Sequence, residues 1–170
     1  WNKYNSELNI TNTFIPSDVY LIAVPTPLEK EKVSCDMSYV KNALTLIGTH
    51  LKKGDIVILV STCPVGTTLE LSKLIKSFSK LIAGHDYFLA YCPERLYPGD
   101  TYNEIVNNEH IIGGFTKDCG LEISKFYKRY ISKYTQITSS SIAELSKLAE
   151  NAYRDVNIAF ANEIASLAEK

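Results

Sequence analysis

Apolar residues near the end of the chain recur at steps of three and four positions. They fall between residues 141 and 169, a stretch with no Gly and no Pro, and they are Ile142, Leu145, Ala149, Ala152, Val156, Phe160, Ile164 and Leu167. This period is that of one face of an α-helix, so it predicts a long helix over 141–169. Ser139, Ser140 or Ser141 can cap its start, and Glu144 stands three residues after Ser141, as a capping box requires.

Upstream of this helix, short runs of β-branched and apolar residues alternate with segments of helical period. The runs predict strands at 18–24, 56–60, 87–91, 110–112 and 135–138. The segments between them predict helices at 36–51, from about 68 to 81 and at 118–130, with a long loop after 95. This alternation is typical of an α/β fold with a parallel Rossmann-like sheet and right-handed crossovers. The pattern changes at the serines, which indicates a boundary between 1–139 and 140–170.

The composition of the chain excludes several classes of function. With 45% hydrophobic and 22% charged residues, the 170-residue chain has the make-up of a soluble globular protein. A net charge of −1 provides no general field for a polyanion, so no nucleic-acid partner is expected. No apolar run is long enough to span a bilayer and no secretory signal is recognisable, so no membrane partner and a cytoplasmic location are expected.

The cysteines and histidines do not form a metal-binding pattern. No two cysteines stand in a C-x-x-C arrangement, and the three histidines add no ligand spacing, so no metal site is expected. The cysteines are Cys35, Cys63, Cys92 and Cys119. Free thiols of a reducing compartment are the favoured interpretation, and burial as small apolar residues is predicted for Cys63 and Cys92.

Three predicted strand ends carry unusual residues: Val-Pro-Thr-Pro at 24–27, Val-Ser-Thr-Cys-Pro-Val-Gly-Thr-Thr at 60–68 and Tyr-Cys-Pro-Glu-Arg at 91–95. In open parallel sheets, ligands bind beyond the carboxyl ends of the strands. The second motif leads into a helix N-terminus, which favours an anion or the edge of a cofactor. The third sets a carboxylate beside a guanidinium, a pair suited to base chemistry and to phosphate or carboxylate binding. Each motif alone is also a plausible turn.

A polar face on the long helix adds to these strand ends. Lys147, Asn151 and Arg154 follow one another at four and three residues, so they share one side of the helix. An amine, an amide and a guanidinium together suit an anionic substrate. Spacing alone favours an ordinary solvated face, whereas the three strand ends favour a binding site.

Together these motifs resemble the UDP-glucose/GDP-mannose dehydrogenase family from about Asp18 to the end of the chain. The matching stretches are 24–27, 61–66, 91–95 with Pro98-Gly99, and the helix sequence 143–163, in the order and spacing of the family. The resemblance implies NAD-dependent oxidation of the C6 alcohol of a UDP-sugar to the carboxylate. Arg95 and the Tyr-Arg-Asp-Val-Asn sequence at 153–157 favour UDP-N-acetyl-D-mannosamine, in surface polysaccharide synthesis. UDP-glucose, UDP-N-acetylglucosamine and a non-catalytic dimerisation module of the same fold remain alternatives.

The resemblance also implies a role for each matching residue. Thr26 and Thr62 are expected to contact NAD. Lys147 is expected to donate or accept a proton and to stabilise oxyanions, and Glu94 to act in acid/base work and water activation. The residues expected to bind the sugar nucleotide are Arg95, Leu96, Lys147, Asn151 and Arg154, of which Lys147 and Asn151 also belong with Glu94 to the catalytic set. Glu163 is interpreted as structural or interfacial.

Two features of the family have no counterpart in this sequence. The G-x-G-x-x-G turn that cradles the NAD pyrophosphate is missing, and no cysteine stands in the context of the family nucleophile. We therefore expect a fragment, with the C-terminal part of the NAD-binding domain at 1–139 and the start of the central helical, dimerisation domain at 140–170. The isolated fragment is expected to be inactive, and its long helix is expected to form a homodimer.

Overall fold

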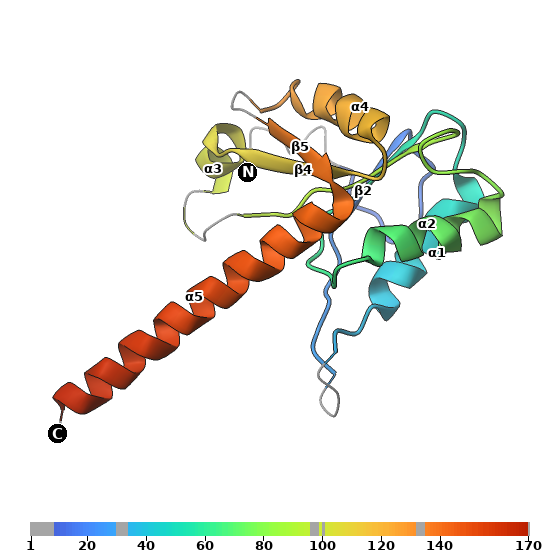
Figure 1. Ribbon diagram of the computed structural model, residues 1–170. Helices are drawn as coiled ribbons and strands as arrows, with labels where there is room; N and C mark the ends of the chain where they lie inside the picture. The colour runs from blue at the N-terminus through green and yellow to red at the C-terminus, as the bar shows by residue number, and fades with distance from the viewer. Residues whose placement is uncertain (1–8, 30–33, 96–98, 100, 132–134, 170) are drawn as a thin grey trace.

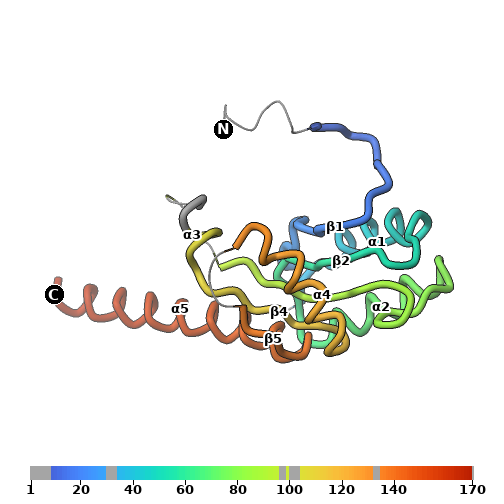
Figure 2. The backbone as a smooth tube through the Cα atoms, turned by 90° about the horizontal axis from the view of Figure 1, so that it is seen from above, coloured from blue at the N-terminus to red at the C-terminus, as the bar shows by residue number. Residues whose placement is uncertain are grey.

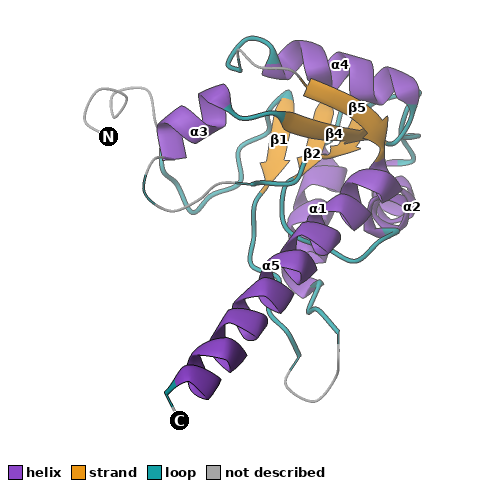
Figure 3. Cartoon of the chain, turned by 60° about the vertical axis from the view of Figure 1, so that its left-hand side comes forward, coloured by secondary structure: helices purple, strands orange, loops and turns teal. Residues whose placement is uncertain are grey.

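The computed structural model describes residues 9–29, 34–95, 99, 101–131 and 135–169. These residues form a five-stranded sheet in the order β1-β2-β3-β4-β5, between α1 and α2 on one face and α4 on the other (Figures 1 and 3). The expected α/β architecture, a mostly parallel sheet followed by a long helix, is confirmed. Along the chain the elements are β1 (Val19–Ile22), α1 (Ser38–His50), β2 (Ile56–Leu59), α2 (Thr67–Ser79), β3 (Phe88–Tyr91), α3 (Thr101–Asn107), β4 (His110–Gly114), α4 (Lys117–Tyr127), β5 (Thr135–Ser139) and α5 (Ser140–Ala168).

The predicted parallel sheet has one antiparallel pairing, so that its last two strands run opposite to the first three. Strands β1, β2 and β3 are parallel, but β4 is antiparallel to β3, and β5 is parallel to β4. The reason lies in the connection after β3, where helix α3 replaces part of the predicted loop. Gly113 pairs with Tyr91, so His110 starts β4 beyond the carboxyl end of β3. The chain therefore stays at that edge and β4 runs back.

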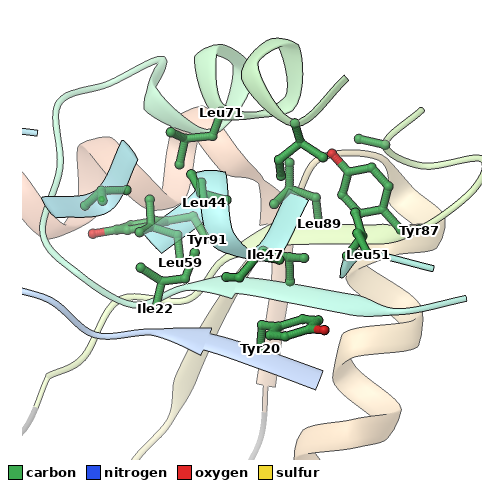
Figure 4. Close-up of a cluster of buried hydrophobic side chains, with 14 of the residues drawn as sticks. Tyr20, Ile22, Leu44, Ile47, Leu51, Leu59, Leu71, Tyr87, Leu89 and Tyr91 are labelled. Carbon is green, nitrogen blue, oxygen red and sulfur yellow. The ribbon is translucent and has the colours of Figure 1, made fainter. Parts of the chain in front are cut away.

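The larger core lies between the sheet and the helices α1 and α2. Alternate side chains of β1, β2 and β3 point to this face, because successive residues of a strand point to opposite sides of the sheet. Figure 4 shows these side chains packed against those of α1 and α2. The cluster includes Tyr20, Ile22, Leu59, Leu89 and Tyr91 from the strands and Leu44, Ile47 and Leu71 from the helices. Each fully buried Leu or Ile contributes about 1.5–3 kcal/mol.

Helix α5 has little contact with the rest of the chain beyond Asn151. Of its 29 residues, all of which are described, Ala143 and Glu144 are buried. The later turns of the helix project away from the body of the molecule (Figures 1 and 2). The predicted apolar stripe is present, but its side chains are exposed, as in Phe160 at 66% and Leu167 at 64%. The stripe is thus a feature of the helix that the described residues do not cover.

The start of α5 differs from the predicted capping box. Ser139 is the cap, and its Oγ accepts a hydrogen bond from the amide of Ile142 at 3.4 Å. Glu144 does not reach back to the cap, because its carboxylate bonds to the turn before α2 instead. A long-range contact therefore replaces the local one.

No helix in the part of the chain that the structure describes has the length and apolar character needed to cross a membrane.

Candidate functional site

The carboxyl ends of β1 and β2 are joined by side-chain hydrogen bonds. The Ser61 hydroxyl donates to the carbonyl of Val24 at 2.7 Å and accepts from the Val24 amide at 2.8 Å. The Thr26 hydroxyl donates to the carbonyl of Thr62 at 2.9 Å. The two threonines expected to contact NAD therefore lie together, on loops that hold each other in place.

The turn between β2 and α2 does not present a free helix N-terminus. Gly66, with φ of +95°, caps α2 in a conformation that favours glycine. Its amide donates to Glu144 Oε2 at 2.6 Å, and the Thr68 amide donates to Glu144 Oε1 at 2.8 Å. The sequence predicts an anion or the edge of a cofactor at these amides. An anion is bound there, but it is the Glu144 carboxylate of this chain and not a ligand.

Cys63, in this turn, and Cys92, directly after β3, are buried, as predicted. Cys63 is 1% exposed, and burial, followed by the nearby Glu144 carboxylate, raises the pKa of its thiol to about 12. Burial also raises the pKa of Cys92. All four cysteines lie in the described residues and are free thiols. Since the thiolate is the reactive form, Cys63 and Cys92 are poor nucleophiles at neutral pH.

Among the described residues, no group of three or more His, Cys, Asp or Glu side chains is arranged to hold a metal ion.

Lys147 lies where α5 passes the carboxyl end of β3. It lines a small hollow of about 80 Å³ with Pro93, Arg95, Ile111, Ser146 and Glu150. Lys147 and Asn151 are partly buried, while Arg154 is exposed. The Arg154 guanidinium donates to the Asn151 side-chain carbonyl at 3.4 Å, so the face predicted from spacing exists. The antiparallel β4 makes this possible: α5 starts beside Gly113 and runs back past Ile111 to Arg95.

An ion pair between Arg95 and Glu150 closes one side of the hollow. The Arg95 Nε lies 3.1 Å from both carboxylate oxygens, and its Nη2 lies 3.0 Å from Oε1. This forked geometry fixes the guanidinium, although both side chains are partly exposed and the net stabilisation is only about 0–1 kcal/mol. Glu150 is not among the residues that the sequence predicts for the site. The one available signal was its position three residues after Lys147, which is too common to be informative.

Glu94 does not line the hollow that contains Lys147. Its Oε1 accepts from the Arg95 amide at 2.7 Å, and its side chain is exposed. It lines a separate, mostly apolar hollow of about 310 Å³ at the ends of β1, β2 and β3, where Cys92 and Tyr127 also lie. The expected acid/base carboxylate and the expected proton-transfer amine thus line different hollows, which adjoin each other because Pro93 and Ile111 line both. Leu96 lies outside the described residues.

The fold and these strand-end motifs define a class of protein. The chain belongs to the UDP-glucose/GDP-mannose dehydrogenase family: residues 2–131 match the NAD binding domain of that family and residues 141–170 match its central domain.

Known members resemble the chain over part of their length. The chain is 41% identical to a UDP-N-acetyl-D-mannosamine dehydrogenase of Campylobacter jejuni, over 91% of this chain and 40% of that protein. It is 42% identical to an NDP-N-acetyl-D-galactosaminuronic acid dehydrogenase of Ralstonia solanacearum, over 91% of this chain and 38% of that protein. The structure of the UDP-N-acetyl-mannosamine dehydrogenase of Staphylococcus aureus superposes with a TM-score of 0.88 at 40% identity, over 97% of this chain and 40% of that one. The chain therefore spans about two fifths of these relatives.

Proposed function

We propose that the whole protein to which this chain belongs is a UDP-N-acetyl-D-mannosamine 6-dehydrogenase. It oxidises the C6 alcohol of the sugar to the carboxylate of UDP-N-acetyl-D-mannosaminuronate, with NAD. The observation that supports this proposal is the Lys147 face of α5, which meets Arg95 at the carboxyl edge of the sheet. In the proposed division, residues 1–139 are the C-terminal part of the NAD-binding domain and residues 140–170 begin the central helical domain.

In this proposal the α5 residues act on the substrate. The Lys147 side chain accepts the proton of the C6 hydroxyl as an amine. The ammonium so formed stabilises negative charge on that oxygen. Asn151 and Arg154 bind the substrate along the same face, where Arg154 already donates to Asn151. Arg95 binds the sugar nucleotide and exchanges part of its pairing with Glu150 for the ligand. Glu94 serves in acid/base work from the neighbouring hollow, in the step that uses water.

The residues present fit part of a dinucleotide. Thr26 and Thr62 form a joined edge at the ends of β1 and β2, and the apolar hollow of about 310 Å³ lies along the same strand ends. The amides before α2 are already bonded to Glu144, so a pyrophosphate would be held by other groups. When bound, NAD accepts the hydride that leaves C6, and two NAD are reduced for each alcohol carried to the carboxylate with one oxygen from water.

NADH formation by the whole protein tests this function. We expect turnover with UDP-N-acetyl-D-mannosamine to exceed turnover with UDP-glucose and UDP-N-acetylglucosamine, each measured by the absorbance of NADH at the same concentration. UDP-N-acetylgalactosamine belongs in the panel because of the similarity to the Ralstonia protein. The isolated 170-residue chain is expected to form no NADH. Turnover by that chain would contradict its assignment as an inactive fragment, and no turnover by the whole protein with any of these sugars would contradict the function.

We further propose that the whole protein is a homodimer that buries the apolar stripe of α5. Large apolar side chains are exposed along the outer part of this helix, including Val156 at 68% and Phe160 at 66%. An exposed apolar stripe of this length favours pairing. Sedimentation equilibrium is expected to give a dimer, and Phe160→Glu is expected to shift it toward monomer. A wild-type protein that sediments as a monomer at high concentration would contradict this proposal.

A further inference from the structure

Glu144 is an unusual buried group in this chain. It is a carboxylate with 0% exposure, in the first turns of a helix whose later residues are exposed. None of the ion pairs among the described residues involves it. A charge taken out of water is costly unless hydrogen bonds or dipoles compensate for it, so its surroundings have to do so.

The compensation comes from the N-terminus of α2. Glu144 Oε2 accepts from the Gly66 amide at 2.6 Å, while Oε1 accepts from the Thr68 amide at 2.8 Å and from the Thr68 hydroxyl at 2.7 Å. Hydrogen bonds to an ionised acceptor are the stronger kind, and the positive end of the helix dipole adds to them. The partners are 76 and 78 residues away in the chain, so these bonds connect two distant elements.

Both connected elements belong to the proposed site. The turn that ends at Gly66 begins with Ser61 and Thr62, which join it to the Thr26 loop. On the other side, Lys147 follows Glu144 by three residues and Asn151 follows by seven, so all three share one face of α5. The carboxylate thus fixes the rotation and the axial position of that face relative to the Thr62 turn. The adjacent side of the helix start, about 100° round from Glu144, is also fixed, because Ala143 packs closely over Gly113.

We infer that Glu144 is a positioning residue for the proposed dehydrogenase reaction. It holds the Lys147 amine in register with the turn on which the cofactor is expected to bind, so that both parts of the site move as one unit. This inference rests on the proposed function. A purely structural cap would stabilise α2 and α5 without affecting the rate of the reaction, which makes the two roles separable.

The kinetic test compares variants of the whole protein. Glu144→Ala removes all three bonds, and kcat is expected to fall about 100-fold, the cost of a displacement of about 1 Å in a reacting group. Glu144→Gln keeps the shape and one acceptor oxygen, so an intermediate loss of kcat is expected, and it serves if the alanine variant does not fold. The matched control is Thr116→Ala, which removes the cap of α4, where the Thr116 hydroxyl accepts from the Cys119 amide at 3.2 Å. It is expected to lower the unfolding temperature and leave kcat unchanged.

Hydrogen exchange provides a second measurement that does not depend on turnover. NAD added to the wild-type protein is expected to slow amide exchange in residues 61–68 and also in residues 142–151. In Glu144→Ala, protection by NAD is expected to persist in 61–68 and to be lost from 142–151. Thr116→Ala is expected to behave as wild type in both segments.

The outcomes separate this inference from the proposed function. An active wild-type protein whose Glu144 variants keep kcat within about twofold, with protection of 142–151 by NAD intact, would overturn the positioning role and leave the function standing. A wild-type protein that neither forms NADH with any of the UDP-sugars nor gains protection from NAD would overturn the proposed function, and this inference with it.

Discussion

Replacement of Lys147 by alanine is expected to lower kcat for NADH formation by the whole protein by about 10²–10⁴-fold, the usual contribution of a positioned acid or base. The side chain is partly buried in the hollow beside Arg95, where an ammonium can approach a substrate oxygen with little water between them. Its neighbours Asn151 and Arg154 remain in the variant, so binding of the sugar nucleotide is expected to change less than kcat. Initial rates over a range of UDP-N-acetyl-D-mannosamine concentrations separate the two quantities.

Two further lysine variants make this test specific. Lys147→Arg keeps the positive charge but cannot release its proton near neutral pH, so the loss of kcat is expected to persist. Lys73 is exposed on α2, and Lys73→Ala is expected to leave kcat within about twofold of wild type. If Lys147→Ala retained more than about a tenth of the wild-type kcat, proton transfer by this amine would be excluded as a main contributor.

Gly113→Ala is expected to destabilise the protein by about 3 kcal/mol, toward the upper end of the usual cost of over-packing. A Cβ at this position would lie 2.6 Å from the Cβ of Ala143 and 2.8 Å from the Cα of Ser140. The second of these is a backbone atom, so relief requires the start of α5 to move away from β4. Because Lys147 lies one turn further along α5, kcat is expected to fall as well. Thermal unfolding and the NADH assay measure the two effects.

Gly48→Ala is the matched control for this glycine. Gly48 lies inside α1, and an added Cβ would come no closer than 3.5 Å to Phe78, which is ordinary contact. Alanine is the better helix former, so this variant is expected to gain about 0.5–1 kcal/mol. Equal unfolding temperatures for the Gly113 and Gly48 variants would show that α5 does not pack on β4 as closely as the structure indicates.

Hydrophobic period was sufficient to predict most elements of the fold. The five strands, α1, α2, α4 and α5 all lie where apolar runs or helical periods predict them. Helix α3 was missed, because its seven residues are too few to display a period. The direction of β4 was also missed. A short strand has the same alternation in a parallel and an antiparallel ladder. The direction of such a strand therefore depends on the end of the sheet at which the connecting segment lets it begin.

The candidate site, like the fold, could be predicted from the sequence only in part. The spacing of Lys147, Asn151 and Arg154 predicts their shared face, since helix geometry alone determines it. Neither Glu150 as the partner of Arg95 nor Glu144 as the partner of the α2 amides follows from local spacing. Local rules instead made Glu144 part of a capping box. The long-range contact prevails because it provides three hydrogen bonds from a helix N-terminus, whereas Ser139 already caps α5.

The sequence by itself thus determines the local features of this chain. These are its strands, its long amphipathic helix, the polar face of that helix and the motifs that mark its family. Those properties depend on neighbours within a few positions. The tertiary structure decides which of these parts meet. It reverses β4, directs α5 back to the carboxyl edge of the sheet, and brings Glu144 to Gly66 across 78 residues. Such contacts arise when distant surfaces are buried together, and no local pattern encodes the partner that a buried charge will find.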